Sequence, residues 1–394
     1  MLEFFTDPIL RAPTIGCMLM GLTSGLIGCL AFLQKRSLVG EALSHAAYPG
    51  VVLGAMLLSQ GSILLGAFLS GLLGLLCIHQ MEKRLKIASD AALCFVLSVF
   101  FGIGVCIASG LQVSHALWLQ KIQVFLLGQA ATMLDGHILV YGTLALICIL
   151  SIVALFRFLE ILHFDPEFAK AVGLPAKATY GVLYLLLMVA IVIGMRSVGV
   201  VLMSSMLIAP PAAARQWTTK FSSFLILSGA LGLVSGFLGN AFVVWLPMAL
   251  PTGPMIALVA TVICLFSLFF APERGFLPKL IRITHFQLRC KQENILKALY
   301  KSWPIPSNPY LLWRMRAKGW VRGGELTPEG HAQAEKLVRL HRLWEVYLVH
   351  MGQESDRVHH SAEEMEHILT PEIEVQLQAL LDNPTTDPHE QPIP

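Results

Sequence analysis

The sequence is short of charge, and it lacks the motifs of an ATP-hydrolysing or disulfide-bonded protein. Asp, Glu, Lys and Arg make up 13% of the 394 residues, whereas soluble domains carry roughly 25%. No GxxxxGK followed by Ser or Thr occurs, so the chain has no P-loop for ATP phosphates. The eight cysteines form no CxxC pair, and we interpret them as small buried hydrophobes rather than disulfides or zinc ligands. A membrane protein that does not itself hydrolyse ATP is expected.

The few charges are divided unevenly between two parts of the chain. Residues 1–271 hold 13 Lys and Arg and 9 Asp and Glu, whereas the shorter stretch 272–394 holds 15 and 16. We therefore predict a transmembrane domain over 1–271, a basic linker over 272–291 and a cytosolic domain over 292–394.

Long apolar runs dominate the first part. A membrane span needs ~20 apolar residues, and nine segments qualify: 14–33, 38–58, 61–79, 91–109, 137–156, 179–195, 198–214, 222–246 and 255–271. Lys and Arg gather in every second connection, which marks those connections and the C-terminal part as cytosolic. The amphipathic stretch 110–130 is interfacial or re-entrant, and one re-entrant segment would reduce the count to eight. The sequence predicts an all-α polytopic membrane protein with eight or nine transmembrane helices.

Two ionisable residues interrupt the second apolar segment. Glu41 and His45 are four residues apart, so they share one face of a helix. Ionisable groups inside a span are costly and usually face a cavity or a partner. A carboxylate with an imidazole suits manganese, iron(II) or zinc, and a second subunit on a twofold axis would supply a second pair. Alternatively, Glu41 lies at the cytosolic interface and His45 forms hydrogen bonds within the bundle.

A cytosolic connection carries the signals of a short helix. In the stretch 163–175, Asp165 suits the N-cap, Pro166 the first turn, Gly173 the end, and Phe168 is its large apolar side chain. Such a helix either packs on the bundle or inserts into a motor subunit.

Three segments together resemble the permease subunits of bacterial metal-uptake ABC transporters. They are SLVGEALSHAAYPGVVLG (37–54), FDPEFAKAVGLP (164–175) and GVVLMSSMLIAPPAAA (199–214). The resemblance implies a fold like that of the cobalamin importer's permease and a dimer of permeases. It also implies a separate cytosolic ATPase and an external solute-binding protein that delivers the metal. The residues that match the family's metal-contacting pair are Glu41 and His45, although Asp is more usual at the first position. Asp165 to Gly173 match its ATPase-coupling helix.

The C-terminal tail is rich in histidine and acid. Seven of the thirteen histidines fall between 331 and 389, and residues 331–394 hold 12 Asp and Glu against 4 Lys and Arg. His341 with Glu345, and Glu363 with His359 and His367, have the spacing that places nitrogen and oxygen ligands on one helix face. A pair of solvated acidic helices is the alternative.

Two segments of the tail, 326–348 and 358–394, resemble the metal-sensing dimerisation region of the diphtheria toxin repressor family. The resemblance implies one metal site at His341, Glu345 and His359 and another at Glu363, Glu366 and His367. Glu363 stands where manganese-responsive members have Glu and iron-responsive members have Cys. Regulatory manganese or iron is therefore expected here.

The region before this tail departs from the repressor pattern. The stretch 292–330 is about one helix too short for a winged helix-turn-helix, although PYLLWRMRAKGWV (309–321) is similar to the end of a recognition helix. Asn294, a weak ligand, and Lys297, which is none, stand where the first helix lends metal ligands. Basic residues in 314–322 either contact DNA phosphates or form a solvated basic face.

We therefore predict the permease subunit of an ABC importer in the bacterial cytoplasmic membrane, with no permanently bound cofactor. The transported ion is manganese, iron or zinc, and the cytosolic tail senses metal. The partner permease is identical or different, membrane lipid surrounds the spans, and DNA is a doubtful partner. A membrane-tethered, metal-dependent transcription regulator is the main alternative. A secondary carrier without an ATPase is a third, and the short cytosolic helix disfavours it.

Overall fold

The computed structural model shows a helical protein that divides into two compact units, Met1–Pro278 and Lys279–Pro394. It describes residues 3–36, 38–56, 60–111, 122, 124–126, 128–196, 199–247, 250–304, 308–354, 358, 362–363, 365, 367–368 and 371–394. The predicted all-α polytopic fold is confirmed.

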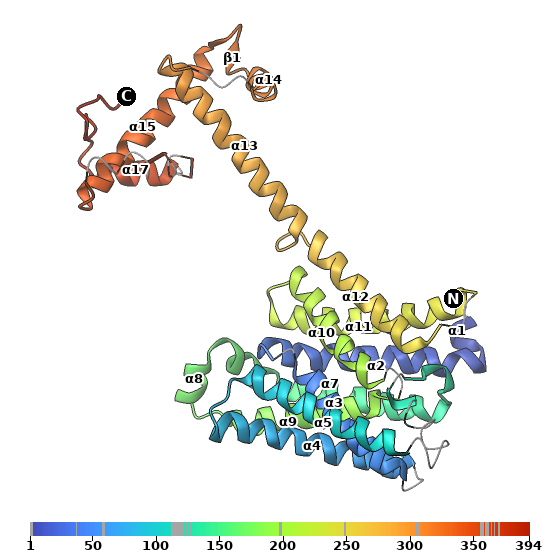
Figure 1. The fold of residues 1–394 in the computed structure, drawn as a ribbon. Coiled ribbons are helices and arrows are strands. Elements are labelled where there is room, and N and C mark those ends of the chain that lie inside the picture. The colour runs from blue at the N-terminus through green and yellow to red at the C-terminus, as the bar shows by residue number, and fades with distance from the viewer. Residues whose placement is uncertain are drawn as a thin grey trace. The chain divides into compact units, whose positions relative to one another are not determined.

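The first unit is a bundle of helices (Figure 1). In chain order, the elements are α1 (Glu3–Thr6), α2 (Pro8–Leu33), α3 (Val39–Met56), α4 (Gln60–Arg84), α5 (Ser89–Leu111), the short 3₁₀ helix η1 (Ala130–Thr132), α7 (Asp135–Phe164), α8 (Pro166–Ala171), α9 (Ala176–Gly194), α10 (Val200–Trp217), α11 (Phe221–Trp245) and α12 (Thr252–Phe270).

Six of these helices are long and apolar enough to cross a membrane: α2, α4 from Gly61, α5, α7, α11 and α12. The stretch Ala178–Gly194 of α9 is apolar but shorter. The predicted spans at 38–58 and 198–214 correspond to α3 and α10, of 18 residues each. Most of the predicted interfacial stretch 110–130 lies outside the described residues. The expected number of eight or nine spans is therefore approximate.

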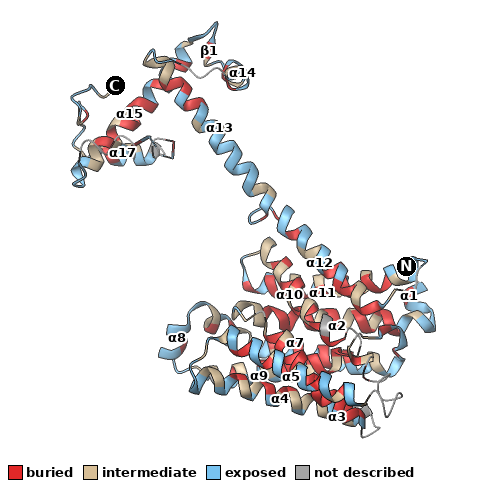
Figure 2. Ribbon diagram, viewed as in Figure 1, coloured by how far each residue is buried: buried red, intermediate tan, exposed pale blue. Residues whose placement is uncertain are grey.

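Helix α2 runs through the middle of the bundle. In the most apolar 18-residue stretch of α2, 67% of the residues are buried. The corresponding share is 28% in each of α4, α5 and α7. The outer faces of α4, α5 and α7 carry exposed leucine, isoleucine and phenylalanine (Figure 2). Such apolar faces are suited to contact with lipid chains.

Glycines set the distance between the central helices. A Cβ atom built on Gly21 would overlap the carbonyl oxygen of Gly232 in α11, and one built on Gly232 would overlap that of Gly21. One turn further, the hydroxyl of Ser228 donates a hydrogen bond of 2.8 Å to the carbonyl of Gly25. Small residues spaced in this way let two backbones pack directly.

The second unit begins within a long helix, α13 (Phe276–Tyr300). The predicted linker range 272–291 therefore contains the first, mostly exposed part of that helix. The other elements are α14 (Pro309–Ala317), the antiparallel hairpin β1 (Val321–Arg322) and β2 (Glu325–Leu326), α15 (Pro328–His350) and α17 (Pro371–Leu380).

A small apolar core joins α13, α14, the hairpin and α15 of the second unit. Its buried members are Ile295, Leu296, Leu311, Met315, Val321, Ala334 and Leu337. Only residues 301–308 separate α13 from α14. The core thus forms around one short helix and a wing-like hairpin.

We expect Gly232→Val to destabilise the bundle, because the valine side chain would meet the backbone of α2. Overpacking typically costs about 1–3 kcal/mol and sometimes more. The matched control is Gly181→Val in α9, where nothing lies within 4 Å of a built Cβ. Thermal unfolding in detergent should show a lower midpoint for Gly232→Val alone. Equal midpoints for the two variants would contradict the packing argument.

Candidate functional site

Helix α3 holds the predicted transmembrane pair in a tightly packed position. It lies against α4, α5 and α10, and nearly all of its residues are buried. Gly50 packs against the backbone of Gly66 in α4. The hydroxyl of Ser70 donates a hydrogen bond of 2.7 Å to the carbonyl of Ala46. These contacts hold α3 against α4 in the turn that follows His45.

His45 has a buried nitrogen available for a ligand. His45 is 8% exposed. Its ring packs edge-on against the ring of Phe101, and the two ring centroids are 4.7 Å apart. Within the described part of the chain, Nδ1 of His45 is buried and has no hydrogen-bond partner. A buried polar atom of this kind needs a partner such as water or an ion.

Glu41 lies in the first turn of α3, one turn before His45, and is partly exposed. An imidazole nitrogen and a carboxylate one turn apart are suitable ligands for manganese, iron(II) or zinc. No group of three or more His, Cys, Asp or Glu that could hold a metal occurs among the residues that the structure describes. Among the described residues, α3 therefore offers two donors one turn apart, fewer than a complete transition-metal site.

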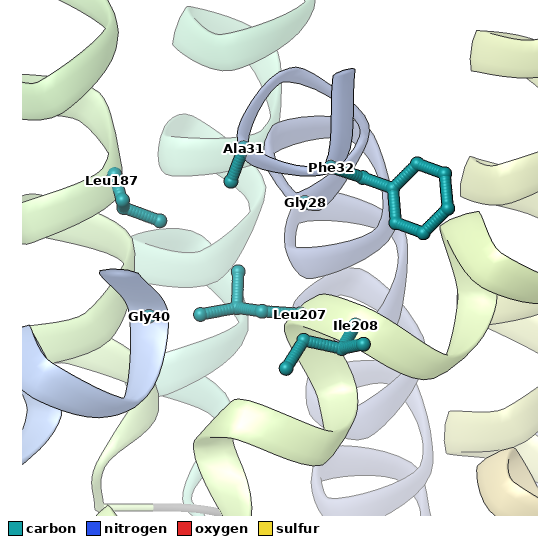
Figure 3. Close-up of a pocket in the computed structure, with 7 residues that line it drawn as sticks. All are labelled: Gly28, Ala31, Phe32, Gly40, Leu187, Leu207 and Ile208. Carbon is teal, nitrogen blue, oxygen red and sulfur yellow. The ribbon is translucent and has the colours of Figure 1, made fainter. Parts of the chain in front are cut away.

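The small void beside Gly40 is not a ligand site. It has a volume of about 10 Å³ and is lined by Gly28, Ala31, Phe32, Gly40, Leu187, Leu207 and Ile208 (Figure 3). A water molecule needs at least about 10–15 Å³ and two to four polar partners. This apolar void between α2, α3, α9 and α10 is a packing defect.

A much larger cavity of about 860 Å³ lies between α2, α4, α7 and α9. At its wall Arg36 pairs with Glu82 at 3.1 Å and donates a hydrogen bond to the hydroxyl of Tyr184 at 3.3 Å. That hydroxyl donates to Gln34 at 2.8 Å. Arg36 belongs to the basic connections that mark the cytosolic side, and its partner Glu82 was not predicted from the sequence. The lone carboxylate in the basic run Glu82–Arg84 was the available signal.

The short predicted helix between two spans is α8. The Asp165 carboxylate accepts a hydrogen bond of 2.9 Å from the backbone nitrogen of Phe168, and Pro166 follows the cap. Gly173 has a φ of +72°, a conformation that favours glycine and ends the helix. Phe168 is 51% exposed, whereas Ala169 is buried. Helix α8 lies at the edge of the bundle (Figure 2), and its one aromatic side chain is exposed there.

In the second unit, α15 brings the first predicted pair of ligands together. His341 Nε2 lies 3.2 Å from Glu345 Oε1, and both side chains are almost fully buried. Nitrogen and oxygen donors that face each other in this way fit a manganese or iron ion. The third predicted ligand of this group, His359, lies outside the described residues.

The other predicted group contains a positive side chain, that of Lys297. His367 Nδ1 lies 2.7 Å from Glu293 Oε2 on α13, and Glu363 Oε1 lies 3.9 Å from the ammonium of Lys297. Glu366, also predicted here, is outside the described residues. Because Lys297 enters this group, the donors do not fit a metal ion as those of the first group do.

Glu293 is a member of this group that the sequence analysis missed. Burial alone would raise the pKa of Glu293, but the hydrogen bonds and charge interactions with His367 and Arg289 together lower it. Of the two residues that match the family's ligands on the first helix, Asn294 is exposed and Lys297 is buried. The spacing of Arg289, Glu293 and Lys297, each four residues apart, was the signal.

Two family descriptions match the chain. The ABC 3 transport family matches residues 6–271. The iron dependent repressor, metal binding and dimerisation domain matches residues 327–394. The second match begins after α14 and the hairpin. Both resemblances stated from the sequence are confirmed.

Relatives with assigned names share these regions. The chain is 33% identical to a protein of Chlamydia trachomatis named "Probable metal transport system membrane protein", over 99% of this chain and 97% of that one. It is 37% identical to the zinc transport system membrane protein TroC of Treponema pallidum, over 72% of this chain and 95% of TroC.

A solved structure supports the fold of the first unit. PsaBC from Streptococcus pneumoniae, in complex with Fab, superposes with a TM-score of 0.62 at 28% identity, over 72% of this chain and 97% of that one. The match of residues 6–271 covers well over half of the chain. The chain belongs to the ABC 3 transport family.

Proposed function

We propose that the chain is the permease subunit of an ABC importer for a divalent transition metal, manganese before iron or zinc. The single observation that carries this proposal is the buried, unsatisfied Nδ1 of His45, one turn from Glu41 within the bundle. Membership of the ABC 3 transport family supports it, as do relatives named for manganese and zinc transport. The cargo would pass these two side chains as a substrate.

The proposed importer needs other chains. A separate ATPase hydrolyses ATP, since the sequence holds no P-loop. A second permease, identical or not, supplies further donors to the ion, because one α3 presents only two. An external solute-binding protein delivers the metal. In this arrangement the chain lies in the bacterial cytoplasmic membrane with residues 292–394 in the cytosol, as the basic connections favour.

The cytosolic unit is proposed to bind a regulatory manganese or iron ion through His341, Glu345 and His359. The facing pair on α15 supports this assignment, as does the match to a metal binding domain. A bound cation would neutralise the local acidic charge and order the tail. The first part of the cytosolic unit, which would have to read DNA, lies before the matched range. The unit is therefore proposed as a sensor for its own transporter rather than as a repressor.

Removal of either transmembrane ligand should abolish uptake. Even loss of an outer-shell partner costs about 10- to 100-fold in metal affinity, so Glu41→Ala and His45→Ala should reduce manganese uptake by at least that much. Glu41→Asp keeps a carboxylate and should retain part of the activity. Radioactive manganese uptake into liposomes that contain the whole importer is the measurement.

The matched control for this experiment is Glu160→Ala, which removes an exposed carboxylate from α7. All variants must co-purify with the ATPase, so that failed assembly is not mistaken for lost transport. Uptake at the wild-type rate by both Glu41→Ala and His45→Ala would refute the metal-contacting role.

We also expect Phe168→Ala to uncouple ATP hydrolysis from uptake, because the ATPase cleft would lose the one aromatic side chain that α8 presents. Phe266→Ala is the control, since Phe266 is a similarly exposed phenylalanine (54%) on the span α12. ATPase activity and uptake should be measured on the same liposomes. If Phe168→Ala preserves both the binding of the ATPase and metal-stimulated hydrolysis, α8 is not the coupling helix.

A further inference from the structure

A buried lysine lies among the acidic residues of the second predicted metal group. Lys297, near the C-terminal end of α13, has a side chain that is only 6% exposed. Its ammonium lies 3.9 Å from Glu363 Oε1. A buried ammonium is costly unless a carboxylate compensates its charge. The negative charge of Glu363 is therefore already balanced by a cation of the same chain.

The neighbouring carboxylate is engaged through both of its oxygens. Oε1 of Glu293 accepts a hydrogen bond of 2.7 Å from Nε of Arg289, and Oε2 lies 2.7 Å from Nδ1 of His367. The side chains of Glu293 and His367 are 9% and 6% exposed, so their contact is buried, whereas Arg289 reaches it from the surface. His367, a predicted metal ligand, thus directs a ring nitrogen to a carboxylate of α13.

We propose that the ammonium of Lys297 takes the place of a metal ion in this group. The cytosolic unit then binds a single metal ion, at His341 and Glu345, and the group of Glu363 and His367 is held together without metal. This inference deepens the proposed function, because it rests on the metal site assigned there to α15.

The chemistry of lysine explains why the two cations exclude each other. A charged ammonium has three donor hydrogens and no lone pair, so it cannot ligate a metal. The Glu363 side chain is 46% exposed, but a divalent ion beside it would lie within a few ångströms of the buried ammonium, and the two positive charges would repel each other. Replacing Lys297 by glutamate would remove the positive charge that repels a metal ion. It would also add an oxygen donor that can ligate one.

The cation also has a structural consequence. Lys297 and Glu293 connect α13 to Glu363 and His367, which follow α15 in the chain. Where metal would otherwise be needed to make this connection, the Lys297–Glu363 ion pair and the Glu293–His367 hydrogen bond make it without metal. Metal that binds at His341 and Glu345 therefore acts on a unit whose α13 side is already assembled.

The test counts bound Mn²⁺ on the purified full-length chain in detergent, by titration monitored with electron paramagnetic resonance. Wild type and Glu363→Gln should bind the same number of ions, because Glu363 holds none. Lys297→Glu should bind one ion more per chain, and the double variant Lys297→Glu/Glu363→Gln should lose it again. Lys291→Glu, which adds the same charge on the exposed part of α13, should gain none.

Two results would overturn the inference. One is a Glu363→Gln chain that binds one Mn²⁺ fewer than wild type, which would mean that Glu363 already holds a metal. The other is a folded Lys297→Glu chain, monodisperse and cooperative in thermal unfolding, that binds no additional ion. If Lys297→Glu does not fold, the comparison of wild type with Glu363→Gln still decides the question.

His341→Ala separates this inference from the proposed function. It should bind one Mn²⁺ fewer than its parent in both the wild-type and the Lys297→Glu backgrounds. If His341→Ala binds as many ions as wild type, the metal site assigned to α15 is wrong. The comparisons at positions 297 and 363 remain valid in that case, because any ion bound at the transmembrane pair is common to all of these variants.

Discussion

The bundle depends on the contact between the backbones of α2 and α11. Where Gly21 meets Gly232 and Gly25 meets Ser228, there is no room for even a methyl group. In a membrane, lipid chains are as apolar as the protein interior, so close packing must hold the helices together. The burial of α2 in the middle of the bundle follows from this contact. Helix α3, packed on α4 by a similar glycine contact, thereby keeps His45 away from lipid.

Both candidate metal sites share one geometric limitation. Each begins with two donors four residues apart on one helix, Glu41 with His45 on α3 and His341 with Glu345 on α15. One helix face offers no more than two such donors to an ion, because the next turn carries them out of reach. The remaining ligands must come from another segment or another chain. Transport and sensing would thus both require an encounter between separate elements.

Local signals made some features predictable, and tertiary contacts hid others. Helix α8 follows from the cap at Asp165 and the left-handed residue Gly173, which act within a few residues of each other. The contact of Glu293 with His367 joins residues 74 apart in sequence. Neither local sequence predicts that contact, and the family pattern places the expected ligand at the neighbouring Asn294. Glu82 stands out locally as a carboxylate in a basic run, but its pairing with Arg36, 46 residues away, was hidden for the same reason.

The lysine beside Glu363 also bears on how the protein can change over generations. Each lysine codon differs from a glutamate codon by a single base. One point mutation at position 297 would therefore exchange a built-in cation for a metal ligand while leaving α13 and its apolar neighbours Leu296 and Ile295 unaltered. The number of metal ions that the tail binds could then differ between related proteins without any rearrangement of the fold.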